Sequence, residues 1–201
     1  MKKKLKRIAI ISIPVIVIVS ILCINAYTHK KDYRGFDYKK LDTGDILFAR
    51  GRSVKSFFVL LINRNTNNYS HCGIIYKENN KCFIIHSTPT PVDKKEGRLV
   101  KELLTDFFVS NKVTIASVYR IDSSHQMFLK KSMVILNNYL HQEILFDDDF
   151  KLNNSKLYCT ELVYKIYNKS GLPLISEDDF NKIIFPCDLI KSAYLRHVLT
   201  Y

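Results

Sequence analysis

The sequence predicts an α+β domain that follows one apolar N-terminal segment, and three observations support this. The chain has 201 residues, which suits a single domain with a short appendage. Hydrophobic residues make up 47% of the chain, enough for a packed core. Patterns typical of helices and of strands alternate along the sequence, which favours a sheet packed against helices.

The N-terminal segment has the features of a membrane anchor. Residues 8–27 form an uncharged run behind the basic tail of residues 1–7. The run is long enough to cross a hydrocarbon core of ~30 Å at ~1.5 Å per residue. The basic tail should stay in the cytoplasm, so residues 28–40, a polar linker, and the domain at 41–201 should lie outside it. Two alternatives remain open: cleavage after Ala26, which would export the domain, and lipidation of Cys23.

The charge distribution excludes one class of partner. The formal net charge is +12, and residues 1–7 carry five of these charges, which leaves +7 spread over the rest. Nucleic-acid binding would need a basic stripe with aromatic or groove-reading motifs, and the sequence has none. We therefore expect no nucleic-acid partner, and instead a solvated surface that attracts anionic lipid or cell-wall polymer.

The expected elements follow from hydrophobic periodicity and turn residues. Apolar and β-branched runs predict strands at 46–49, 71–76, 81–86 and 113–121. Helical spacing predicts helices at 53–62, 100–108, 124–141, 157–168 and 186–195. Residues 78–80 indicate a hairpin turn, and Gly171 indicates a helix C-terminus. The acidic loop at 146–154 lacks the spacing of a calcium site, so we expect a solvated turn there.

The cysteines indicate a free thiol rather than a metal site or a disulfide framework. Their number is odd and no CxxC pair occurs; they are Cys23, Cys72, Cys82, Cys159 and Cys187. We expect no metal ion and no organic cofactor.

Cys159 is the candidate nucleophile. It shares one face of the helix at 157–168 with Leu162, Val163 and Ile166, so its sulfur should face the domain. It also lies in the first turn, where unpaired N–H groups and the helix dipole lower a thiol pKa. The same spacing fits a small buried core cysteine, which is the alternative.

Two histidines could supply the base and its orienting partner. If the hairpin turn has an even number of residues, with Lys77 opposite Cys82, then Gly73 faces His86. His71 is then the diagonal neighbour of His86, ~7 Å away on the same face. One imidazole, His71, could take the thiol proton while His86 orients it. An odd-length turn would send His86 to the other face, leaving two ordinary strand histidines.

Taken in order, the motifs resemble those of the permuted NlpC-type papain-fold hydrolases, specifically the YiiX/YebB-like group, distant relatives of lecithin–retinol acyltransferase. The matching segments are 44–48, 50–53, 69–75, 84–86, 146–150 and 156–163. The resemblance implies a circularly permuted papain-like fold in which the histidine motif precedes the cysteine motif. It also implies nucleophile Cys159, base His71 and orienting residue His86. In many relatives a glutamate or another polar residue holds the third position.

These features leave three hypotheses for function. The first is an amidase or peptidase that forms a thioester on Cys159 and acts on cell-wall peptides, which suits an extracytoplasmic domain. The second is a lipid acyl hydrolase or acyltransferase, which suits the anchor and the apolar helix at 53–62. The third is a catalytically inactive binding module, against which the intact Cys159, His71 and His86 argue.

Overall fold

The computed structural model describes residues 36–51, 69–89, 96–110, 113–152, 155–176 and 183–201. The predicted anchor at 8–27 and the predicted helix at 53–62 lie outside these residues. No helix in the described part of the chain is long and apolar enough to cross a membrane. Phe36, within the segment expected to be linker, is buried against the rings of Phe108 and Tyr201. The packed body therefore includes Phe36.

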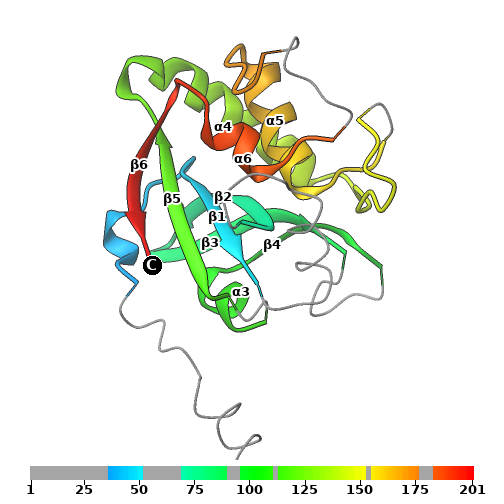
Figure 1. The fold of residues 1–201 in the computed structure, drawn as a ribbon, viewed down its shortest axis with the longest axis horizontal. Helices are drawn as coiled ribbons and strands as arrows, with labels where there is room; N and C mark the ends of the chain where they lie inside the picture. The colour runs from blue at the N-terminus through cyan, green and yellow to red at the C-terminus, as the bar shows by residue number, and fades with distance from the viewer. Residues whose placement is uncertain (1–35, 52–68, 90–95, 111–112, 153–154, 177–182) are drawn as a thin grey trace, which may run out of the picture. The chain divides into compact units, whose positions relative to one another are not determined.

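A six-stranded antiparallel sheet in the order β4-β3-β2-β1-β5-β6 forms the centre of the domain (Figure 1). Its strands are β1 (Ile46–Arg50), β2 (His71–Glu78), β3 (Lys81–Thr88), β4 (Arg98–Leu103), β5 (Ile115–Ile121) and β6 (Leu195–Thr200). The histidine-bearing strands β2 and β3 lie in its interior, so both are fixed by neighbours on each side.

Helices cover the two faces of this sheet differently. On one face, α5 (Cys159–Ser170) packs against β2 and β3, and α4 (Gln126–Leu140) lies beside α5 (Figure 1). Alternate strand residues such as Phe48 and Ile74 join the buried face of α5 in one hydrophobic core. The short helix α3 (Leu104–Ser110) contacts β3 and β4 and carries the buried ring of Phe107.

The β2–β3 hairpin has the register that the sequence predicts. Lys77 pairs with Cys82, and the turn between the strands consists of Asn79 and Asn80. These two asparagines have φ of 49° and 60°, the left-handed conformation that a two-residue type I′ turn requires at both positions. The turn chemistry therefore fixes an even register and places His86 on the same face as His71.

Two predicted helices are partly wrong. The segment predicted as a helix at 100–108 is strand β4 up to Leu103, and only then α3. The last predicted helix, 186–195, is a one-turn helix α6 (Pro186–Ile190), after which the chain enters β6. In the first case the pairing of β4 with β3 overrides the local helical pattern. In the second, the chain turns at residues 191–194 before β6 pairs with β5.

The acidic loop is not a uniformly solvated turn as expected. Asp147 is buried, whereas Asp148 and Asp149 are exposed. The Asp147 carboxylate accepts the backbone N–H groups of Asp149 at 3.0 Å and Lys151 at 2.6 Å. The side chain therefore replaces backbone partners and holds the turn in one shape.

Candidate active site

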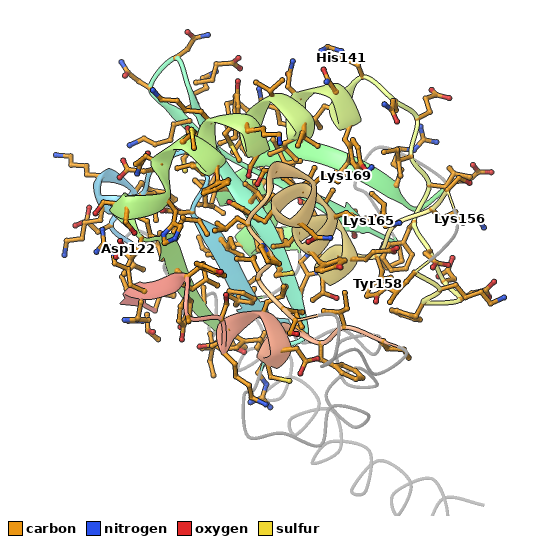
Figure 2. All side chains as sticks on the ribbon, turned by 90° about the horizontal axis from the view of Figure 1, so that it is seen from above. Asp122, His141, Lys156, Tyr158, Lys165 and Lys169 are labelled. Carbon is orange, nitrogen blue, oxygen red and sulfur yellow. The ribbon has the colours of Figure 1, made fainter. Side chains whose placement is uncertain are left out.

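Cys159 begins helix α5, directly after the N-cap residue Tyr158, whose backbone is extended. Figure 2 shows Tyr158 at this end of α5, with Lys165 further along the same helix. The Tyr158 N–H donates to Glu161 Oε2 at 3.4 Å, and Lys165 pairs with the other carboxylate oxygen at 2.7 Å. These contacts hold the first turn, so the half-buried thiol sits where helix N–H groups favour negative charge.

His71 and His86 meet across the hairpin. Nε2 of His71 lies 2.8 Å from Nδ1 of His86, and the two rings stand edge to face at 88°. The ring of Phe107 stacks on His71 and packs edge-on against His86. His86 is fully buried and His71 partly buried, so these ring contacts hold the pair in place.

Glu102 extends the pair into a chain of three side chains. His86 Nε2 lies 2.7 Å from Glu102 Oε1, and Glu102 is the diagonal neighbour of His86 on β4. Burial lowers the pKa of His86, and the hydrogen bond to Glu102 opposes that shift. A neutral His86 that donates from Nε2 to the carboxylate must accept at Nδ1. His71 therefore donates from Nε2, and its Nδ1 is the ring nitrogen left for the thiol.

The Cys159 thiol has a pKa well below its usual range. A hydrogen bond from the Cys72 thiol lowers it most, burial opposes this, and the charge and hydrogen bond of His71 add to the lowering. The backbone N–H of Cys72 contributes in the same direction. The pKa of Cys72 is raised, first by its complete burial and then by the contact with Cys159. Cys159 is therefore the thiolate of this pair and Cys72 the thiol.

The structure thus brings together the three residues singled out in the sequence: Cys159, His71 and His86. It adds two that sequence reasoning missed, Glu102 and Cys72. Glu102 was missed because residues 100–108 were predicted to be a helix. A predicted strand there would have placed Glu102 and Val100 on one face, next to His86. Among the described residues, no cluster of three or more His, Cys, Asp or Glu side chains could hold a metal ion.

A thiolate at a helix N-terminus, facing a histidine chain on an antiparallel sheet, defines a papain-like thiol hydrolase. The histidine strand precedes the cysteine helix in the chain, so the arrangement is permuted. Residues 40–198 match the Peptidase C92 family, described as permuted papain-like amidase enzymes of the YaeF/YiiX kind. The chain belongs to this family, and it is a cysteine hydrolase of the amidase type.

A solved relative supports the fold. The crystal structure of YiiX from Escherichia coli O157:H7, described as a metalloprotein, aligns with a TM-score of 0.63 and 18% identity. The alignment covers 81% of this chain and 98% of that one. A search of curated proteins found no match.

Proposed function

We propose that the protein is a membrane-tethered, extracytoplasmic amidase that forms an acyl-thioester on Cys159, with His71 as base and His86 as orienting residue. One observation carries this proposal: the low-pKa Cys159 thiol contacts His71, whose other nitrogen is held through His86 to Glu102. An inactive binding module would have no use for such an arrangement of buried polar groups, which is costly to bury unless each member is paired.

The reaction follows from this geometry. The Cys159 thiolate attacks the amide carbonyl carbon, and the oxyanion forms near the backbone N–H groups at the start of α5. The His71 imidazolium gives its Nδ1 proton to the leaving amine, and the C–N bond breaks to leave a thioester. A water molecule then gives a proton to His71 and attacks the thioester, which releases the carboxylic acid and restores the thiolate–imidazolium pair.

The rest of the polar chain keeps His71 in the correct tautomer. During both steps His71 Nε2–H donates to His86 Nδ1, while His86 Nε2–H donates to Glu102. A carboxylate at the far end stabilises the positive charge that His71 carries whenever Cys159 is a thiolate.

Intact-mass measurement tests the chemistry. We expect the full-length protein, mixed with an amide substrate and quenched in acid, to gain the mass of the acyl group. The Cys159→Ala variant should gain nothing and release no amine, whereas Cys187→Ala should behave like the native protein because that thiol is fully buried. Undiminished amine release from Cys159→Ala would reject the assignment.

The proposed location rests on the uncharged run at 8–27 and the basic tail before it. It can be tested with a cysteine placed at Val134, a residue that is 63% exposed. In intact cells, a membrane-impermeant maleimide should label the full-length chain that carries both Cys159→Ala and Val134→Cys, and should label it more than Cys159→Ala alone. Labelling only after lysis would place the domain in the cytoplasm.

A further inference from the structure

A pocket opens beside Cys159, which is one of its lining residues. Its walls are largely aromatic and aliphatic, from Phe150, Tyr158, Ile183, Ile184, Phe185 and Pro186. It encloses about 430 Å³ of empty space, part of it open to solvent. The pocket also reaches Ser70 and Thr160, but neither His71 nor His86 is among the residues that line it.

The hydroxyl groups of Tyr158 and Thr160 in these walls already have hydrogen-bond partners within the protein. Tyr158 Oη accepts the backbone N–H of Ile184 at 3.0 Å, and Thr160 Oγ1 donates to the Ile184 carbonyl at 2.6 Å. Apart from Cys159, whose negative charge is lost when it is acylated, none of the described residues that line the pocket carries a charged side chain. A carboxylate or ammonium group bound here would lose water without gaining a counter-charge from these walls, which is unfavourable.

Phe150 forms part of the wall in a strained conformation. Its φ is 55°, in the left-handed region that a bulky side chain rarely adopts. The ring packs against Tyr158 with centroids 5.2 Å apart, and the two hydrogen bonds to Asp147 fix the residues on either side. Strain of this kind persists where the surrounding structure imposes it, and often at binding sites.

The position of the pocket decides which half of the substrate it holds. The leaving amine must depart next to His71, which protonates it, and His71 lies outside the pocket walls. The acyl half stays bonded to Cys159, and Cys159 is itself part of the wall. The group that occupies the pocket therefore belongs to the acyl half.

We propose that this pocket binds an uncharged, apolar acyl group, so that the enzyme prefers amides with a hydrophobic acyl side. This inference rests on the proposed amidase function and narrows its substrate class. Either an aliphatic chain or an apolar amino-acid residue could supply such a group.

Two sets of probes test it on the full-length protein. The first contains aminomethylcoumarin amides with acetyl, octanoyl, N-acetyl-leucyl and N-acetyl-glutamyl groups. The second contains chloromethyl ketones with the same four groups, whose alkylation of Cys159 needs no amide cleavage. We expect the octanoyl or the leucyl probe to react ~10-fold or more faster than the acetyl and glutamyl probes, both in kcat/KM and in alkylation rate. A faster octanoyl probe would indicate an aliphatic chain in the pocket, and a faster leucyl probe an apolar amino-acid residue.

The two sets separate failure of this inference from failure of the proposed function. Apolar preference in alkylation without any amide cleavage would keep the pocket assignment and reject the amidase mechanism. Cleavage or alkylation at equal rates for all four groups, or fastest with the glutamyl group, would overturn the inference.

Variants locate the preference in the pocket. Phe150→Gly removes the aromatic wall, so the ratio of octanoyl to acetyl alkylation, measured on the folded protein, should fall toward one. Ile183→Glu should speed alkylation by an N-acetyl-lysyl probe relative to the octanoyl probe. Val134→Ala, at an exposed position on α4, is the matched control and should keep the native ratios. Native ratios in both pocket variants would contradict the proposal.

Discussion

Two neighbours act on one sulfur at Cys159. His71 supplies a positive charge and a hydrogen bond, and Cys72 supplies a thiol donor from the next position on β2. A thiolate in a half-buried site loses much of its hydration, so each donor that replaces water has a large effect on its stability. Cys159 is the thiolate and Cys72 the hydrogen-bond donor because Cys72 is fully buried and Cys159 is not.

Thiol labelling should therefore be selective. With a low concentration of iodoacetamide near pH 6, we expect Cys159 to react and the buried Cys72 and Cys187 to remain unmodified. Cys82 should also remain unmodified because burial raises its pKa to about 11. The thiolate of Cys159 forms above its lowered pKa, so its labelling should persist at pH values where ordinary thiols are silent.

Peptide mapping by mass spectrometry measures this selectivity. In His71→Ala, the pH midpoint for labelling of Cys159 should move upward because a cationic partner is lost. Equal reactivity of Cys159 and Cys82 across the pH range would contradict the nucleophile assignment.

The contribution of the Cys72 thiol to the lowered pKa of Cys159 can be measured separately. Cys72→Ala removes the S–H donor but keeps the backbone N–H, so the pKa of Cys159 should rise and its labelling rate near pH 6 should fall. Hydrogen bonds to charged groups contribute ~1.5–3 kcal/mol, which corresponds to a loss of about tenfold or more. Cys82→Ala, a cysteine variant on the same hairpin, should leave the pH profile unchanged. An unaltered profile in Cys72→Ala would mean that His71 alone stabilises the thiolate.

Glu102 acts as a positioning residue through His86. Glu102→Gln keeps the size of the side chain but removes the charge that makes His86 donate from Nε2. We expect kcat to fall by roughly 10² or more, as general acid–base contributions of this kind do, with a smaller change in KM. The pH midpoint of Cys159 alkylation should also rise. If kcat and that midpoint both stay at native values, Glu102 has only a structural role.

At the scale of elements, three adjacent strands build this polar chain. His71, His86 and Glu102 come from β2, β3 and β4, each diagonal to the next on one face. The two-residue turn at Asn79 and Asn80 sets the first step, and the pairing of His86 with Val100 sets the second. A shift of one residue in either pairing would send a member of the chain to the opposite face.

Gly73 keeps the space that the histidine pair needs. A Cβ at this position would lie 2.9 Å from the Cβ of His86 and 2.7 Å from Cγ1 of Ile84. Gly73→Ala should therefore displace His86, destabilise the fold by about 1–3 kcal/mol and abolish most amide cleavage. Urea unfolding and a coumarin-amide assay measure the two effects.

A core variant on the same strand provides the comparison. Ile74 lies in the hydrophobic core on the face away from the histidines. Ile74→Val should lower the free energy of unfolding by about 0.5–1.5 kcal/mol. It should nevertheless keep its activity. Equal losses of activity in the two variants would show that general stability, rather than the histidine spacing, decides the outcome.

These elements also show what the sequence could and could not predict. The hairpin, the even register and the first turn of α5 depend on local signals: a turn pair, alternation and helical spacing. Glu102 depends on the pairing of β4 with β3, and local periodicity misassigned its segment as helix. β6 depends on its pairing with β5, and no element was predicted for its residues after Leu195. Cys72 became significant only once α5 was placed over β2, a packing relation that no spacing within the sequence encodes.

At the scale of the whole molecule, one turn connects the sheet to the helix that carries the nucleophile. The carbonyl of Gly44 accepts the hydroxyl of Tyr167 on α5 at 2.6 Å. The next residue, Asp45, is buried and bonds Arg120 on β5 through both of its oxygens, at 2.7 and 2.8 Å. Asp45 Oδ2 also accepts the backbone N–H of Asp42 at 2.8 Å, which closes the turn.

The Asp45–Arg120 pair should therefore matter for stability far more than a surface ion pair does. Asp45→Asn removes the negative charge and leaves the guanidinium with Asp42 as its remaining carboxylate partner among the described residues. Breaking a buried pair costs about 3–5 kcal/mol where the remaining charge has no partner. The cost here should be smaller than that, because Asp42 and the Lys40 carbonyl still contact the guanidinium. The urea midpoint of the full-length protein should fall accordingly, while Cys159 alkylation in the folded protein at low urea stays at its native rate.

The exposed pair between Asp37 and Lys40 gives the matched comparison. Its atoms lie 3.6 Å apart and its side chains are 46% and 65% exposed, so Asp37→Asn should change the free energy of unfolding by only ~0–1 kcal/mol. If Asp45→Asn changes the free energy of unfolding as little as Asp37→Asn does, the buried turn contributes little to the stability of the packing between the sheet and α5. If Asp45→Asn instead lowers both the urea midpoint and the alkylation rate of the folded protein, this turn helps to position Cys159 against His71. The stability of the fold and the geometry of the site would then depend on the same contact.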